Sequence, residues 1–105
     1  METADLMFLV ITYDVSSART EVYKKLLVKF LTHEQNSVFA GDLTESQYRK
    51  LRAALLKVAE PGDRLLQFQT ANRHNLRAVS LVKNEGNGAL EEKELLRHSL
   101  GSLIL

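Results

Sequence analysis

The fold is decided by one apolar stretch near the N-terminus, Leu6-Met7-Phe8-Leu9-Val10-Ile11-Thr12-Tyr13-Asp14. The run before Asp14 is rich in apolar and β-branched residues and shows no alternation of polar and apolar positions. Such continuity predicts a strand that is covered on both of its faces. One face would carry the odd-numbered residues from Met7 to Tyr13, and the other would carry Phe8 and Val10.

Two helices and three further strands are predicted downstream of this strand. The region from Ser16 to Thr20 favours a turn, and the apolar stripe after it predicts a first helix, with Tyr23, Leu26, Leu27, Phe30 and Leu31 on one side. Thr44 and Gln47 form a capping box that predicts a second helix over Thr44–Ala59. The remaining strands are expected at Asn36–Gly41, Arg64–Thr70 and Leu76–Val82. A split of the Gln35–Leu43 region is the alternative.

This order of elements suits an α+β ferredoxin-like sandwich, in which an antiparallel sheet carries two helices on one face. Alternating strands and helices are also typical of a parallel sheet. In the sandwich the helices leave the other sheet face open, although Phe8 and Val10 make that face of the first strand apolar. Because C2 dimers are the commonest oligomers, we expect a homodimer that pairs through the sheet face.

The chain beyond the last predicted strand is expected to lie outside the sandwich. We place the ferredoxin-like domain at residues 1–83, and a linker followed by a C-terminal segment at residues 84–105. Leu90–Leu96 suggests a short helix. The apolar end, Ser99–Leu105, suits a strand that packs on the dimer or, alternatively, a disordered tail.

Length and composition exclude several classes of protein. The chain has 105 residues, 45% hydrophobic and 26% charged, with a net charge of +1, which is typical of one globular domain. No apolar run approaches the roughly 18 residues of a membrane span, and the acidic first residues lack the basic flank of a secretory signal. The absence of cysteine excludes disulfides and cysteine nucleophiles. We expect a cytoplasmic protein without membrane contacts.

Asp14 is the strongest candidate for chemistry, because it ends an apolar strand where a turn begins. A carboxylate there is placed to hold a hard cation such as Mg²⁺ or to orient a water molecule. One carboxylate makes a poor magnesium site, but a C2 dimer with this strand near its axis would bring two copies of Asp14 to one ion. An Asx turn or a helix cap is the simpler interpretation.

The remaining polar groups give weaker signals. Arg19, near the start of the first helix, suits a phosphate contact or an ordinary surface position. Ser37 and Phe39 share one face of the predicted second strand, where Phe39 is expected in the core or in an interface. The histidines show no metal-ligand spacing and are expected in loops or at the surface: His33, His74 and His98.

Together these segments resemble the second universal CRISPR-associated protein family, the small endoribonuclease-type subunit of the spacer-acquisition complex. The resemblance rests on Tyr13-Asp14-Val15, on Arg19 and on Asn36–Gly41 followed by Leu43-Thr44, and it spans Met7 to Val82. It implies a ferredoxin-like homodimer in which Asp14 binds Mg²⁺ or Mn²⁺. Four further residues match positions that the family links to the nuclease site: Tyr13, Arg19, Ser37 and Phe39.

The resemblance implies two compatible roles. One is a bridge between dimers of the larger CRISPR integrase subunit, which holds duplex DNA during spacer acquisition. The other is a metal-dependent endonuclease for single-stranded RNA or double-stranded DNA. Basic side chains on the two predicted helices are candidates for phosphate contacts: Lys24, Lys25, Lys29, Arg49, Lys50 and Arg52. The alternatives are a stand-alone toxin-type ribonuclease of related fold and a non-catalytic ferredoxin-like binding module.

Overall fold

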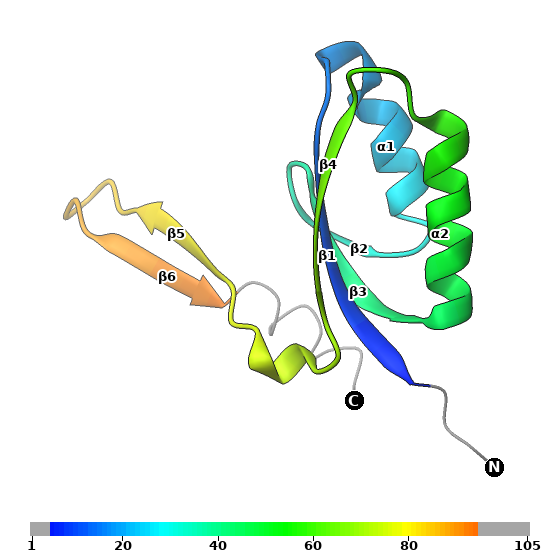
Figure 1. The fold of residues 1–105 in the computed structure, drawn as a ribbon. Coiled ribbons are helices and arrows are strands. Elements are labelled where there is room, and N and C mark those ends of the chain that lie inside the picture. The colour runs from blue at the N-terminus through cyan, green and yellow to red at the C-terminus, as the bar shows by residue number, and fades with distance from the viewer. Residues whose placement is uncertain (1–4, 95–105) are drawn as a thin grey trace.

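The computed structural model describes residues 5–94 and contains a four-stranded antiparallel sheet with two helices on one face (Figure 1). The strands lie in the order β2-β3-β1-β4, and a separate antiparallel pair, β5-β6, projects on the other side. This arrangement confirms the predicted ferredoxin-like sandwich. The elements are β1 (Leu6–Asp14), the 3₁₀ turn η1 (Ser17–Arg19), α1 (Thr20–Leu27), β2 (Thr32–Gln35), β3 (Val38–Thr44), α2 (Glu45–Val58), β4 (Arg64–Thr70), the 3₁₀ turn η2 (Arg73–Asn75), β5 (Val79–Lys83) and β6 (Leu90–Glu94).

Strand β1 occupies the centre of the sheet because both of its faces are apolar. It pairs along seven residues with β3 and along seven with β4. Leu9 and Ile11 are 0% and 1% exposed and pack in a core with residues of both helices. On the opposite face, Phe8 and Val10 form a smaller buried cluster with Ala40. The two apolar faces predicted from the sequence are both buried.

The region around residue 36 differs from the main prediction. A single strand over Asn36–Gly41 is wrong, because the chain forms a hairpin of β2 and β3 there, as in the alternative split. Asn36 adopts a φ of 39°, a left-handed conformation that asparagine tolerates, and this allows the reversal. Helix α1 also stops before the end of its apolar stripe, although Leu31 still reaches the core at 6% exposure.

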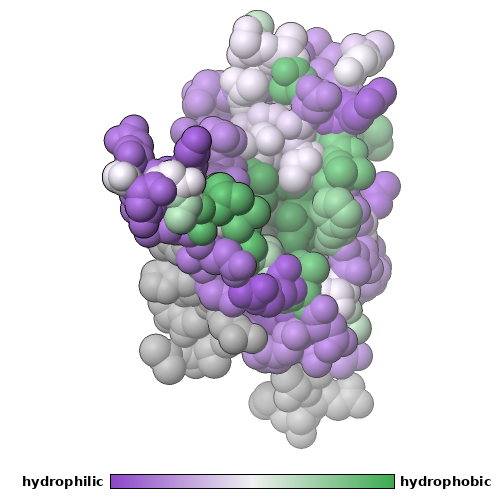
Figure 2. Space-filling view, turned by 90° about the vertical axis from the view of Figure 1, so that its left-hand side faces the viewer, coloured by the Kyte–Doolittle hydropathy of each residue, from purple (hydrophilic) through white to green (hydrophobic). Residues whose placement is uncertain are grey.

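The sheet face without helices carries an apolar strip that is only partly covered. Leu66 and Phe68 of β4 lie opposite Thr12 and Val10 of β1 in the ladder, and they are 56% and 53% exposed. Figure 2 views the molecule from this side and shows apolar side chains gathered across its middle. We call Leu66 and Phe68 the open strip.

The C-terminal part of the described chain forms a β-hairpin apart from the main sheet (Figure 1). The prediction of a short helix from Leu90 is wrong, since residues 90–94 pair with β5. Arg77 contributes to this pairing with ion pairs to Glu92 and Glu94, at 2.9 and 3.1 Å. The stretch predicted as a linker is the turn of the hairpin, and the predicted strand Leu76–Val82 begins only at Val79 and does not join the main sheet. The strand or tail predicted for Ser99–Leu105 and the position predicted for His98 lie outside the described residues.

Candidate functional site

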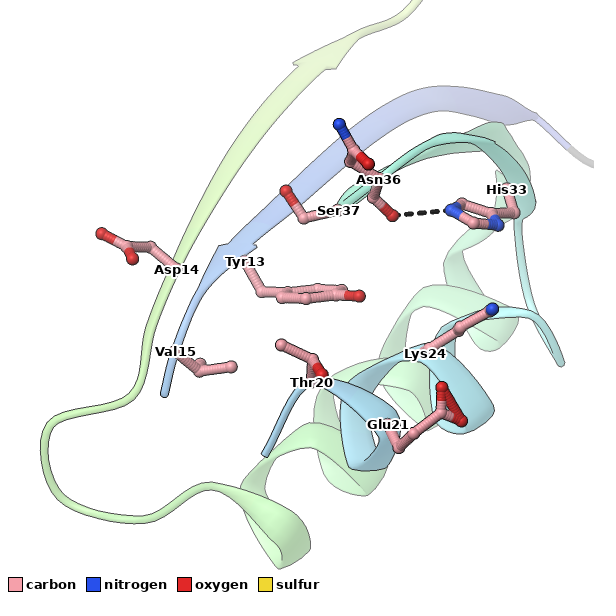
Figure 3. Close-up of a pocket in the computed structure, with 9 residues that line it drawn as sticks. All are labelled: Tyr13, Asp14, Val15, Thr20, Glu21, Lys24, His33, Asn36 and Ser37. Atoms are coloured by element: carbon pink, nitrogen blue, oxygen red, sulfur yellow. Dashed lines mark hydrogen bonds between the residues drawn. The ribbon is translucent and has the colours of Figure 1, made fainter. Parts of the chain in front are cut away.

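A cavity of about 450 Å³ opens beside the end of β1 (Figure 3). Its walls come from three places in the chain: the end of β1, the first turns of α1, and the hairpin of β2 and β3. The fold therefore brings the Tyr-Asp end of the first strand next to Ser37. The lining residues are Tyr13, Asp14, Val15, Thr20, Glu21, Lys24, His33, Asn36 and Ser37.

An aromatic cluster fixes the ring of Tyr13 inside this cavity. Its ring centroid lies 5.8 Å from that of Tyr23 and 6.0 Å from that of Phe39. Burial, followed by the charge of Glu21, raises the pKa of Tyr13 above its usual 10.0, so its hydroxyl remains a hydrogen-bond donor at neutral pH. Phe39 is fully buried, which confirms its place in the core and limits its role to supporting its neighbours.

His33 is exposed, as the surface position expected from the sequence requires, and from strand β2 it also lines the cavity. Its ring stacks on Phe39 at 4.5 Å with an interplanar angle of 13°, and its Nε2 lies 2.6 Å from the carbonyl oxygen of Asn36. The signal for this position is the pairing of His33 with Phe39 across the hairpin. That signal depends on the split of the predicted second strand.

Asp14 points away from Tyr13, although the two residues are adjacent in sequence (Figure 3). Alternation along the strand places Tyr13 on the helix side and Asp14 on the open side, opposite Arg64 of β4. Its side chain is exposed. Among residues 5–94, no group of three or more acidic or histidine side chains is close enough to hold a metal ion. Within one chain, therefore, Asp14 provides a single exposed carboxylate.

Arg19 lies outside the cavity, in a network that ties the loop after β1 to the loop before β4. Its Nε and Nη2 atoms are 3.0 and 2.9 Å from Asp63 Oδ2, and its Nη1 is 3.1 Å from Glu60. It also donates to the carbonyl oxygen of Val58, and Tyr23 donates its hydroxyl to Asp63. Hydrogen bonds from Arg19, and then from Tyr23, lower the pKa of Asp63 from 3.8 to about 2. The nitrogen atoms of the Arg19 guanidinium are therefore occupied by contacts within the protein, which leaves them poorly placed to bind a phosphate.

Asp63 and Glu60 are partners of Arg19 that the sequence pattern does not indicate. Both flank Pro61-Gly62, which the sequence marks only as the end of a helix. Glu60 donates its backbone N–H to Asp63 at 3.0 Å, so the carboxylate also closes this turn. Nothing in the local pattern of residues links this turn to Arg19, because 44 residues separate Arg19 from Asp63.

The candidate phosphate contacts lie on the outside of the two helices. Lys24, Lys25, Lys29 and Lys50 are exposed. Arg49 lies 3.7 Å from Glu45 one turn earlier, and Arg52 donates to the hydroxyl of Tyr48 at 2.9 Å. The lysines are therefore freer to meet a phosphate than the two arginines. Neither helix of the described chain has the length and apolar character needed to span a membrane.

Sheet order and helix placement define a small ferredoxin-like protein. At the end of its central strand, the cavity around Tyr13 lies on the helix side and the exposed Asp14 lies on the open side. Residues 7–78 match the family described as CRISPR associated protein Cas2. This match covers more than half of the chain, and the protein belongs to the Cas2 family.

Individual relatives agree with this assignment. The chain is 38% identical over 68 residues to a CRISPR-associated endoribonuclease Cas2 of Haloferax volcanii, covering 65% of this chain and 79% of the relative. A Cas2 endoribonuclease of Thermodesulfovibrio yellowstonii is 35% identical over 75 residues, covering 70% and 85%. A solved structure described as the crystal structure of Cas2 superposes with a TM-score of 0.68 at 26% identity, covering 82% of this chain and 98% of the other.

Proposed function

We propose that this protein is a homodimeric subunit of CRISPR adaptation, which binds duplex DNA and bridges dimers of the larger integrase subunit during spacer acquisition. We further propose that it hydrolyses phosphodiester bonds with Mg²⁺ or Mn²⁺. Family membership and the names of the relatives support the two roles. The observation that carries the proposal is that Asp14 lies on the same sheet face as the open strip.

A dimer through this face would join the apolar and acidic features. Asp14, Thr12 and Val10 are successive residues on the open side of β1, and Leu66 and Phe68 lie beside the last two. Residues two apart on a strand are separated by roughly 7 Å, so the carboxylate is within a short distance of the open strip. Two copies that cover each other's open strip would therefore bring two Asp14 side chains toward one symmetry axis.

The residues present fit a magnesium or manganese ion only in such a dimer. One chain offers a single carboxylate, whereas Mg²⁺ is commonly held by one or two carboxylates together with water and substrate phosphates. When bound, the ion would supply charge stabilisation to a phosphodiester and a more acidic water. Asp14 of each chain would hold it. The Arg19–Asp63 network would position Asp14 by fixing the loop that follows it.

Each phosphate of duplex DNA or of single-stranded RNA carries one negative charge, so both nucleic acids are candidate substrates. Lys24 and Lys50 are exposed cations suited to sequence-independent phosphate contacts, and their contribution would weaken as salt increases. The absence of cysteine suits a reducing compartment, and we place this role in the cytoplasm.

The decisive experiment reconstitutes spacer integration with the larger integrase subunit and measures cleavage of RNA and DNA with Mg²⁺ in parallel. Wild type is compared with Asp14→Asn and with Asp5→Asn, a matched carboxylate change just before β1. We expect cleavage to be lost in Asp14→Asn and retained in Asp5→Asn. Equal cleavage by all three proteins would show that the nuclease activity does not depend on Asp14.

The integration assay separates the two roles. Integration retained by Asp14→Asn would show that the carboxylate is dispensable for bridging, which is the expected result. If the wild-type protein neither binds the integrase subunit nor supports integration, the adaptation role is wrong. Cleavage without integrase binding would instead favour a stand-alone ribonuclease, and neither activity would favour a non-catalytic binding module.

A further inference from the structure

A groove with a cavity of about 430 Å³ runs between α1 and α2, which lie side by side (Figure 1). Its apolar walls come from both helices and from the turn after α1: Val22, Leu26, Phe30, Ala54 and Val58. Along the α1 side, Val22, Leu26 and Phe30 recur every fourth residue. The groove therefore presents an apolar floor about two helical turns long.

Lysines surround this apolar floor. Lys25, Lys29 and Lys57 line the groove, and all three are exposed. None of the ion pairs found within residues 5–94 includes them, and the groove lining contains no acidic residue. The groove thus joins apolar surface to positive charge that the described chain leaves unneutralised.

We propose that this groove binds an acidic amphipathic helix of a partner protein. Helix-in-groove recognition needs an apolar floor for side chains that recur every three or four residues, and the groove offers that floor. Lysines on its rim select carboxylates that flank the apolar stripe of the incoming helix. Lys25 and Lys29 are four residues apart, so they match acidic residues one turn apart on the partner.

The groove suits a peptide better than a nucleic acid. A phosphate backbone would satisfy the lysines but would bring nothing apolar to the floor. Bases of a single strand bind by stacking on aromatic rings, and Phe30 is the one aromatic side chain in the lining. The aliphatic character of the other four walls therefore favours aliphatic side chains.

This surface goes beyond the proposed dimer and does not depend on it. The groove lies in the helix layer, on the side of the sheet opposite the open strip (Figure 1). Pairing through the open strip would leave it accessible in both copies. A dimer would then carry two equivalent docking grooves, while a monomer would carry one.

The test uses the full chain, labelled with ¹⁵N, and a stapled helical peptide with leucines on one face and glutamates beside them. A peptide of the same composition in scrambled order and a single-stranded oligo(dT) are the comparison probes. Binding is measured by fluorescence anisotropy and located by amide chemical shifts. We expect the acidic helix to bind more than tenfold tighter than the scrambled peptide and to shift the resonances of Val22, Leu26 and Ala54.

Two sets of variants test the residues. Lys25→Glu/Lys29→Glu should weaken binding of the acidic helix at least tenfold, whereas Arg49→Glu/Lys50→Glu, an equal charge change elsewhere on the helix layer, should weaken it much less. Ala54→Leu fills the groove without changing charge and should also weaken binding. The proposal is wrong if the peptide does not bind, or if oligo(dT) binds more tightly than the peptide. It is also wrong if the two charge variants lose the same affinity, or if Ala54→Leu binds the peptide as tightly as wild type. Loss of the dimer alone would leave it intact.

Discussion

Replacing Phe68 by threonine tests the interface on which the proposed function depends. Phe68 lies on the open side of β4 and is 53% exposed, opposite Val10 in the ladder. Threonine keeps the preference for β-structure and removes the ring. Because half of the ring is already in water, we expect the change to affect association more than folding of the single chain.

The size of the effect follows from the exposed area. A phenylalanine side chain presents roughly 200 Å², so the exposed half is about 100 Å². At about 25 cal/mol per Å², covering this area contributes about 2.5 kcal/mol in each copy and about 5 kcal/mol in a symmetric dimer. Since association also costs side-chain and rigid-body entropy, we expect a weakening of the dimer Kd by at least about 100-fold.

Sedimentation equilibrium over a range of protein concentrations measures this Kd directly. The matched control is Leu56→Gln, which removes an exposed apolar side chain from α2, where 80% of the residue is in solvent. We expect the control to associate like wild type. A monomeric wild-type protein, or an unchanged Kd for Phe68→Thr, would refute the assignment of the open strip as the interface.

Two further changes test the Arg19–Asp63 network and the cap of α2. The folded pKa of Asp63 is lowered from 3.8 to about 2, so its stabilisation is complete above pH 4 and is lost as the pH falls toward 2. Asp63→Asn should therefore lower the melting temperature at neutral pH and flatten its decline in acid, and parallel melting curves would contradict this. Thr44→Ala removes the cap of α2, in which Thr44 Oγ1 accepts from Gln47 N–H at 3.1 Å, and should cost about 1 kcal/mol in urea unfolding. If the free energy of unfolding of Thr44→Ala equals that of wild type within experimental error, the Gln47 side chain is sufficient to cap the helix.

The central strand and the second helix could be predicted because their signals are local. An unbroken apolar run specifies a strand buried on both faces, and a capping box specifies where a helix begins. The hairpin at Asn36 was harder, because one residue in a left-handed conformation divides a stretch that otherwise has the character of a single strand.

The errors and omissions arise from contacts between distant residues. Leu90–Glu94 has a helix-forming composition, but pairing with β5 and the two ion pairs of Arg77 hold it extended. The partners of Arg19 could not be inferred, because the loop that holds Asp63 reaches it only through the fold. The resemblance links Tyr13, Asp14 and Ser37 to one site, whereas the place of His33 in the cavity follows only from its pairing with Phe39 in the hairpin.

Tyr13 and Asp14 are adjacent along the chain, but their side chains lie on opposite faces of the sheet. The register of β1 therefore decides which of the two groups each face presents. Inserting a single residue into the strand upstream would exchange the two environments, turning the phenol outward and the acid into the aromatic cluster. Inserting two would restore the original parity. Ladders on both sides of the strand hold it against such slippage, so the backbone register itself sets which chemical group each side of the protein presents.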